Sequence, residues 1–143
     1  MSPILEALRK RENNSFNEFK YFTGIKGVYN NYFDKGNLTA ITLPYSIKVI
    51  QQYAFFGNKL SKLIIPETCT EVYGNILEKN GVDCDIIFLS PTPPKTNNVF
   101  LMNRYARVKL TVYVPDESVE AYRAQSGFVG YENQVRPMSE LNK

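Results

Sequence analysis

The sequence predicts a mainly β fold with short helices, arranged as a short solenoid of stacked coils that is capped at both ends. Two observations predict this class. Apolar residues recur with a period of 22 residues, and short segments of alternating apolar residues each stop at a proline. A fixed period of this length is typical of stacked supersecondary units. About two strict repeats, from residue 25 to 77, are followed by two degenerate coils.

Three columns of apolar residues carry the period, and the members of each column are 22 residues apart. The columns are Val28, Ile50 and Val72; Phe33, Phe55 and Leu77; and Ile25, Ile47 and Cys69. Equivalent side chains therefore stack from one coil to the next. We expect all three columns to point into the core, with the phenylalanine column filling the space between coils.

The strands are predicted from apolar alternation with period two. The expected strands span 38–44, 60–66, 85–89 and 110–115, with a second short extended segment at 47–50. Proline has no N–H to donate, so it ends the strands that precede it. Gly36-Asn37 and Gly57-Asn58 occupy nearly equivalent places and are interpreted as turns between elements.

The N-terminal segment, residues 1–15, is predicted to form a helix over 2–12, with Pro3 at its first position. Two interpretations stay open: the helix caps the open end of the stack, or it is a docking helix for a partner. Phe16, Phe19 and Phe22 follow at a spacing of three and are expected to pack under the first repeat.

The C-terminal end is predicted to close the other side of the stack. Asp116 is expected to cap a helix over 116–125, and Gly127 is expected to stop that helix. The apolar residues after it are enough for the chain to fold back on the last coil. The organisation is therefore an N-terminal helix (1–15), a solenoid with its capping helix (16–138) and a tail (139–143).

Composition narrows the function classes. The chain has 143 residues and a net charge of +3, from 17 basic and 14 acidic side chains that are scattered. This charge is too small to indicate nucleic acid as a partner. No window approaches about 18 consecutive apolar residues, so membrane insertion is not expected. No signal peptide is recognised at the N-terminus. Localisation stays open: extracellular or cell surface for a fragment of a secreted protein, virion for a phage-encoded one.

The sequence shows no set of residues that indicates a catalytic or metal site. Histidine is absent, which removes the commonest general base and metal ligand. We therefore expect no enzyme and no cofactor. Cys69 and Cys84 are interpreted as buried apolar residues, and an oxidising compartment would allow a disulfide between them. Asp83 and Asp85 are expected to be structural or solvated, because a calcium loop needs more oxygen ligands.

The candidate site is the outward face of the strands. If residues such as Leu63 and Ile65 point inward, their neighbours point outward and lie side by side across the sheet. The expected outward row is Thr42, Ile64, Phe88 and Tyr113, with Lys62 and Lys109 as a polar rim. An exposed apolar row marks a contact site. The sequence therefore predicts a protein-contact face here, unless the N-terminal helix or the C-terminal tail covers it.

Several segments in register resemble one known family, the BspA-like leucine-rich-repeat proteins. The matching segments are FKYFTG (19–24), LTAITLPYSI (38–47), IQQYAF (50–55) and LSKLIIP (60–66). YVPDESVEAY (113–122) resembles the C-terminal closing unit of such proteins from gut and oral Bacteroidetes. The resemblance covers about residues 16–138.

The resemblance implies a leucine-rich-repeat solenoid and a non-enzymatic module that binds a protein or glycan partner at a cell surface; some such proteins bind host matrix proteins. It carries over no catalytic residue. The chain departs from the family's usual form in having few repeats and no recognised secretion signal. An alternative function is therefore kept: a structural component of a larger assembly, such as the virion of a phage with a Bacteroidetes host. That role would require self-assembly.

Overall fold

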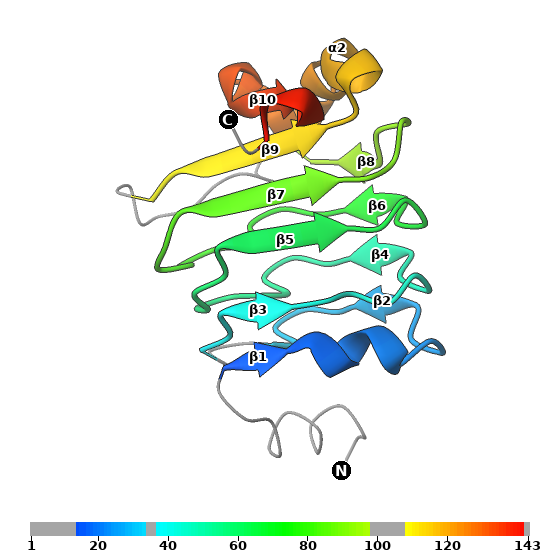
Figure 1. Cartoon of the computed structure of the whole chain (residues 1–143), viewed down its shortest axis with the longest axis vertical. Helices are drawn as coiled ribbons and strands as arrows, with labels where there is room; N and C mark the ends of the chain where they lie inside the picture. Colours follow the sequence, from blue (N-terminus) through cyan, green and yellow to red (C-terminus); the bar gives the residue numbers. More distant parts are fainter. Residues whose placement is uncertain (1–13, 34–36, 98–107, 142–143) are drawn as a thin grey trace.

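The computed structural model describes residues 14–33, 37–97 and 108–141 (Figure 1). In these ranges the chain is mainly strand with a few short helices, as predicted. Two expectations concern residues outside these ranges: the N-terminal helix over 2–12, and Gly36 of the turn expected at Gly36-Asn37.

The strands form two sets, and the chain visits the sets alternately. The first set is β1 (Ser15–Phe16), β3 (Ala40–Ile41), β5 (Lys62–Ile65), β7 (Cys84–Phe88), β9 (Leu110–Val114) and β10 (Val135–Pro137). The second set is β2 (Gly27–Val28), β4 (Val49–Ile50), β6 (Glu71–Val72) and β8 (Lys95–Thr96). Within each set neighbouring strands pair in parallel, in the orders β1-β3, β10-β9-β7-β5 and β2-β4-β6-β8. Figure 1 shows the two sets running in opposite directions, with β1 and β10 at opposite ends of the stack.

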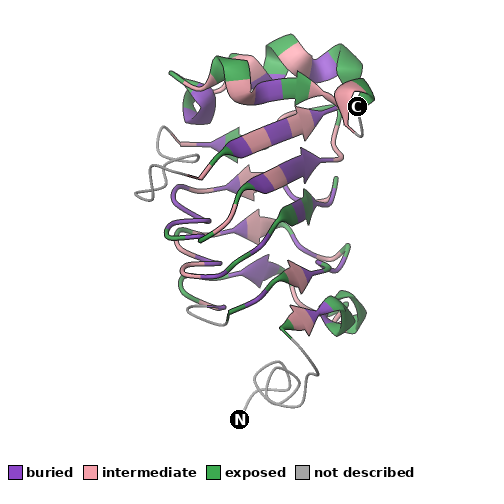
Figure 2. Cartoon of the chain, turned by 60° about the vertical axis from the view of Figure 1, so that its left-hand side comes forward, coloured by how far each residue is buried: buried purple, intermediate pink, exposed green. Residues whose placement is uncertain are grey.

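The hydrophobic core lies between the two sets of strands. Phe33 and Phe55 stack with ring centroids 5.6 Å apart and planes 5° from parallel, and Leu77 continues the column in the buried interior. The column of Val28, Ile50 and Val72 is fully buried, while Ile47 and Cys69 are buried and Ile25 is partly buried against the core. The inward direction of the three columns is thus confirmed. Figure 2 shows the alternation of burial along β9.

Aromatic rings fill the core beside β1. Phe16 and Phe19 are fully buried and stack at 5.5 Å, and Phe22 packs against both. Phe19 also meets the edge of Phe33 at 5.2 Å, which joins this group to the column above it. The expectation that the three phenylalanines pack under the first repeat is confirmed. Residues Asn17–Tyr21 form a 3-10 helix (η1).

Two buried asparagines tie successive turns of the chain together. The Asn58 side-chain carbonyl accepts a hydrogen bond from the Leu38 N–H (2.9 Å), and its amide donates to the carbonyls of Phe33 (2.8 Å) and Phe55 (2.9 Å). Asn80, 22 positions later, accepts from the Leu60 N–H at 2.8 Å. The interpretation of Asn58 as a simple turn residue was therefore incomplete.

The C-terminal segment closes one end of the stack. It forms η2 (Asp116–Ser118), α2 (Val119–Arg123), η3 (Ser126–Phe128), η4 (Glu132–Gln134), β10 and η5 (Met138–Glu140). The helix predicted over 116–125 exists, but it begins as a 3-10 turn and ends at 123. The predicted return of the chain onto the last coil is confirmed, because β10 pairs with β9.

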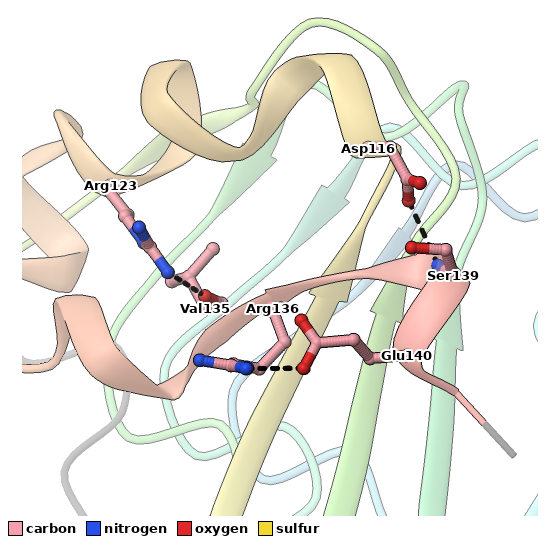
Figure 3. Close-up of polar contacts among 6 residues, drawn as sticks. All are labelled: Asp116, Arg123, Val135, Arg136, Ser139 and Glu140. Carbon is pink, nitrogen blue, oxygen red and sulfur yellow. Dashed lines mark hydrogen bonds and ion pairs between the residues drawn. The ribbon is translucent and has the colours of Figure 1, made fainter. Parts of the chain in front are cut away.

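The polar contacts of this closing unit differ from the expected cap. The N-cap position is Pro115 for η2 and Ser118 for α2, and Asp116 is the first residue of η2. The Asp116 carboxylate accepts a hydrogen bond from the Ser139 N–H at 3.0 Å (Figure 3). Arg123 donates to the Val135 carbonyl at 2.8 Å and so ties α2 to β10. The helix also stops before Gly127, whose role is close packing: a Cβ there would lie 2.5 Å from Thr96 Oγ1.

Candidate functional site

The outer face of the first set of strands carries a continuous row of side chains, set by the strand register. Ile64 of β5 lies opposite Ile87 of β7, and Ile87 lies opposite Tyr113 of β9. Thr42 precedes Ile64 by 22 residues and directly follows β3. Its hydroxyl donates to the Asn17 side-chain oxygen at 2.9 Å. We call Thr42, Ile64, Ile87 and Tyr113 the outer row.

The placement of Phe88 in this row was wrong. Phe88 lies opposite Ile65, is 1% exposed, and packs against the rings of Tyr122 (5.3 Å) and Phe128 (6.3 Å). The sequence interpretation aligned Ile87 with Leu63, whereas the structure pairs Leu63 with Ile86. Because side chains alternate along a strand, this shift of one residue exchanges the two faces of β7. Ile87 therefore replaces Phe88.

The outer row is apolar at its centre. Ile64 is 43% exposed, whereas Ile87 is 5% exposed yet does not belong to the hydrophobic core cluster. Tyr113 and Thr42 retain solvent exposure at the flanks. Ile64 and the half-buried Tyr113 therefore present aliphatic and aromatic surface on the outside of a sheet, where a solvated face would carry polar residues, and Ile87 between them is almost fully buried.

The two lysines expected to form a polar rim lie beside the outer row. Lys62 is exposed and lies opposite Asp85, and Lys109 is exposed just before β9. Asp83 accepts a hydrogen bond from the Lys109 N–H at 2.7 Å, which fixes the chain entering β9. Asp83 thus has the structural role expected of it, and both lysines lie where a rim requires them.

A second outward feature, missed in the sequence, lies on the second set of strands. It is a shallow depression lined by Asn30, Gln51, Gln52, Tyr73 and Asn97. A pattern in the sequence could have revealed it: the residue directly after each of β2, β4, β6 and β8 is a tyrosine or an amide. These residues are Tyr29, Gln51, Tyr73 and Asn97. Strand register brings these four residues side by side.

The thiols offer no reactive site. Cys69 and Cys84 are both free and buried, so the disulfide left open by the sequence is not formed. Burial raises the pKa of each thiol to about 12, which keeps both protonated near neutral pH. The interpretation of Cys69 as a buried apolar residue is confirmed.

Two further site classes find no support in the described part of the chain. Across 14–33, 37–97 and 108–141, no group of three or more acidic or sulfur-bearing side chains is placed to hold a metal ion. Within the same residues no helix has the length and apolar character needed to cross a bilayer.

Comparison with known proteins agrees with the repeat architecture. The family described as BspA type Leucine rich repeat region, in 6 copies, matches residues 9–105, about two thirds of the chain. The match includes every strand from β1 to β8 and stops before β9. A comparison with curated proteins finds none that matches. Members of leucine-rich-repeat families are typically non-enzymatic and take part in protein interactions. The chain belongs to the BspA-type leucine-rich-repeat family.

Proposed function

We propose that this chain is a short leucine-rich-repeat solenoid and a non-enzymatic, surface or adhesion module that binds a protein partner through the outer row. One observation supports it most: Ile64, Ile87 and Tyr113 are adjacent in register on the outside of a sheet. Apolar surface with polar neighbours is typical of protein-contact sites, and Lys62 and Lys109 provide such a rim.

The arrangement of helices leaves this face available. In Figure 1 the described helices lie toward the two ends of the stack, and none of them lies over β5 and β7. A parallel sheet is usually covered on both faces. Because Ile64 is 43% exposed on a face that no described helix covers, we infer that this face associates with a partner.

The partner class can be tested with host matrix proteins, the partners that the family resemblance implies. Purified chain would be passed over immobilised fibronectin and laminin, and dissociation constants measured for wild type and Ile64→Ser. We expect the variant to bind at least about fivefold more weakly, since a central apolar contact contributes more than about 1 kcal/mol. Val129→Ser is the matched control: Val129 is an aliphatic residue, 63% exposed and outside the row.

Self-association is the second outcome that the outer row allows, and the structural-component alternative requires it. Light scattering after size exclusion would then give a mass above the 16.4 kDa of one chain, with Ile64→Ser restoring a monomer. A monomeric wild type that binds neither matrix protein, or equal affinities for Ile64→Ser and Val129→Ser, would contradict a contact function for the outer row.

A further inference from the structure

Three of the five residues that line the depression, Gln51, Tyr73 and Asn97, occupy one repeated position, directly after β4, β6 and β8. Strand register pairs Val28 with Ile50, Ile50 with Val72, and Val72 with Thr96. The residues that follow these strands are therefore also neighbours: Tyr29, Gln51, Tyr73 and Asn97. Ladder hydrogen bonds continue into this position, from the Gln51 N–H to the Val28 carbonyl (2.8 Å) and from the Tyr73 N–H to the Ile50 carbonyl (2.9 Å). The backbone beneath the depression is thus fixed.

Three of the side chains that line the depression are primary amides that face solvent. Asn30, Gln51 and Gln52 make no side-chain hydrogen bond within the described residues, and each retains solvent exposure. A primary amide offers two donors and an acceptor. The three side chains therefore bring donors and acceptors together on one rigid surface.

One tyrosine, Tyr73, belongs to the lining, and a second, Tyr29, lies beside the depression in the same row of residues. Burial and a hydrogen bond to the Glu71 carboxylate raise the pKa of Tyr73, so its hydroxyl stays protonated. Tyr29 lies next in the row and is 46% exposed. Its ring lies over Gly27, where a Cβ would come within 2.9 Å of the ring, so the glycine lets the ring lie close to the sheet. An aromatic surface therefore adjoins the amide groups.

The charge and shape of the depression narrow the ligand class. None of its five lining residues is charged, and the nearest facing pair in the strands, Glu71 and Lys95, has opposite signs. None is aliphatic, so an apolar peptide anchor would find no pocket. The backbone of β4 and β6 is paired on both sides, so the two central strands offer no free edge to an added peptide.

We propose that this depression binds a neutral oligosaccharide. Amide donors and acceptors match sugar hydroxyl groups, and the C–H face of a pyranose ring packs on tyrosine. Neighbouring strands lie about 4.8 Å apart, so Tyr29 and Tyr73, two strands apart, are spaced by roughly 10 Å. That span accommodates more than one sugar ring. The site is separate from the outer row and goes beyond the protein contact proposed for it.

Affinity electrophoresis in native gels tests the proposal. The gels would contain soluble glucan, mannan, galactan or xylan, and retardation would be measured against a gel without polysaccharide. The test variant is Gln51→Ala/Gln52→Ala, which changes no charge and removes no described hydrogen bond. Ile64→Ser, on the other set of strands, is the control that separates this site from the outer row.

We expect at least one neutral polysaccharide to retard the wild type and Ile64→Ser equally, and the dissociation constant of the double variant to rise at least tenfold. Three results would overturn the proposal. One is no retardation by any of the four polysaccharides. Another is equal retardation of the double variant. The third is a loss of fibronectin or laminin binding in the double variant, which would assign the depression to protein contact.

Discussion

Replacing Asn58 by alanine is expected to destabilise the stack more than any exposed asparagine replacement. Asn58 is 1% exposed, and its side chain satisfies the Leu38 N–H and the carbonyls of Phe33 and Phe55. The alanine variant leaves three backbone groups without this partner in a buried place. Each unsatisfied buried group costs about 1–3 kcal/mol, and carbonyls tolerate the loss better than N–H groups. We expect a loss of roughly 2–5 kcal/mol.

Guanidinium unfolding followed by circular dichroism measures this loss, with ΔG of unfolding compared at equal slope. The melting temperature should fall by roughly 8–15 °C. Asn133→Ala is the matched control: Asn133 is exposed in η4, and its replacement should change stability by no more than about 0.5 kcal/mol. Equal stability of the two variants would refute the reasoning that buried asparagines join the coils.

Two further predictions concern the closing unit and the thiols. Gly127→Ala should cost about 1–3 kcal/mol in thermal unfolding, because the new Cβ would meet Thr96, whereas Gly24→Ala, with nothing within 4 Å, should cost little; equal costs would contradict the close packing. Burial raises the pKa of Cys69 and Cys84 to about 12 in the folded protein, whereas an unfolded thiol loses its proton at about pH 8.5. The thiols therefore contribute fully to the free energy of unfolding below about pH 8.5, and this contribution is lost as pH rises toward 12. Stability at pH 10 should therefore be lower by about 2 kcal/mol per thiol, and both thiols should resist iodoacetamide until the chain is unfolded; rapid labelling of the folded protein would contradict their burial.

Where the 22-residue period is strict, the sequence predicted the core and the strands β3, β4 and β5, but it did not predict β2 or β6. Equivalent residues in the first coils bury equivalent side chains, so the spacing of Phe33 and Phe55 was enough to assign them to one column. The end of the chain was also predictable in outline, because an acidic segment followed by apolar residues after β9 indicated a helix and a return.

The candidate site was only partly predictable because its register depends on a loop. Between β5 and β7 the pairing offset is 23 residues, from Leu63 to Ile86, and the sequence between them does not show which residue is extra. A run of apolar residues such as Ile86, Ile87 and Phe88 fits either face equally well. The contacts of Phe88 with Tyr122 and Phe128 of the closing unit decide which face of β7 points inward.

The buried polar contacts were not predictable for a different reason. Asparagine is common in turns, so nothing local distinguishes Asn58, which bonds across coils, from an exposed turn residue. Asp116 likewise has the composition of a helix cap, but its carboxylate accepts from Ser139, 23 positions away. Long-range partners of short polar side chains leave no periodic signal.

The direction of the side chains in β7 defines the outer row, and the proposed contact function depends on it. The decisive measurement is the free energy of unfolding of Phe88→Ala beside Ile64→Ala. A buried phenylalanine costs about 3–5 kcal/mol when truncated, whereas Ile64, at 43% exposed, should cost under about 1 kcal/mol. That difference is the predicted result. A Phe88→Ala variant as stable as Ile64→Ala would place Phe88 on the surface and contradict the outer row as defined by Ile87.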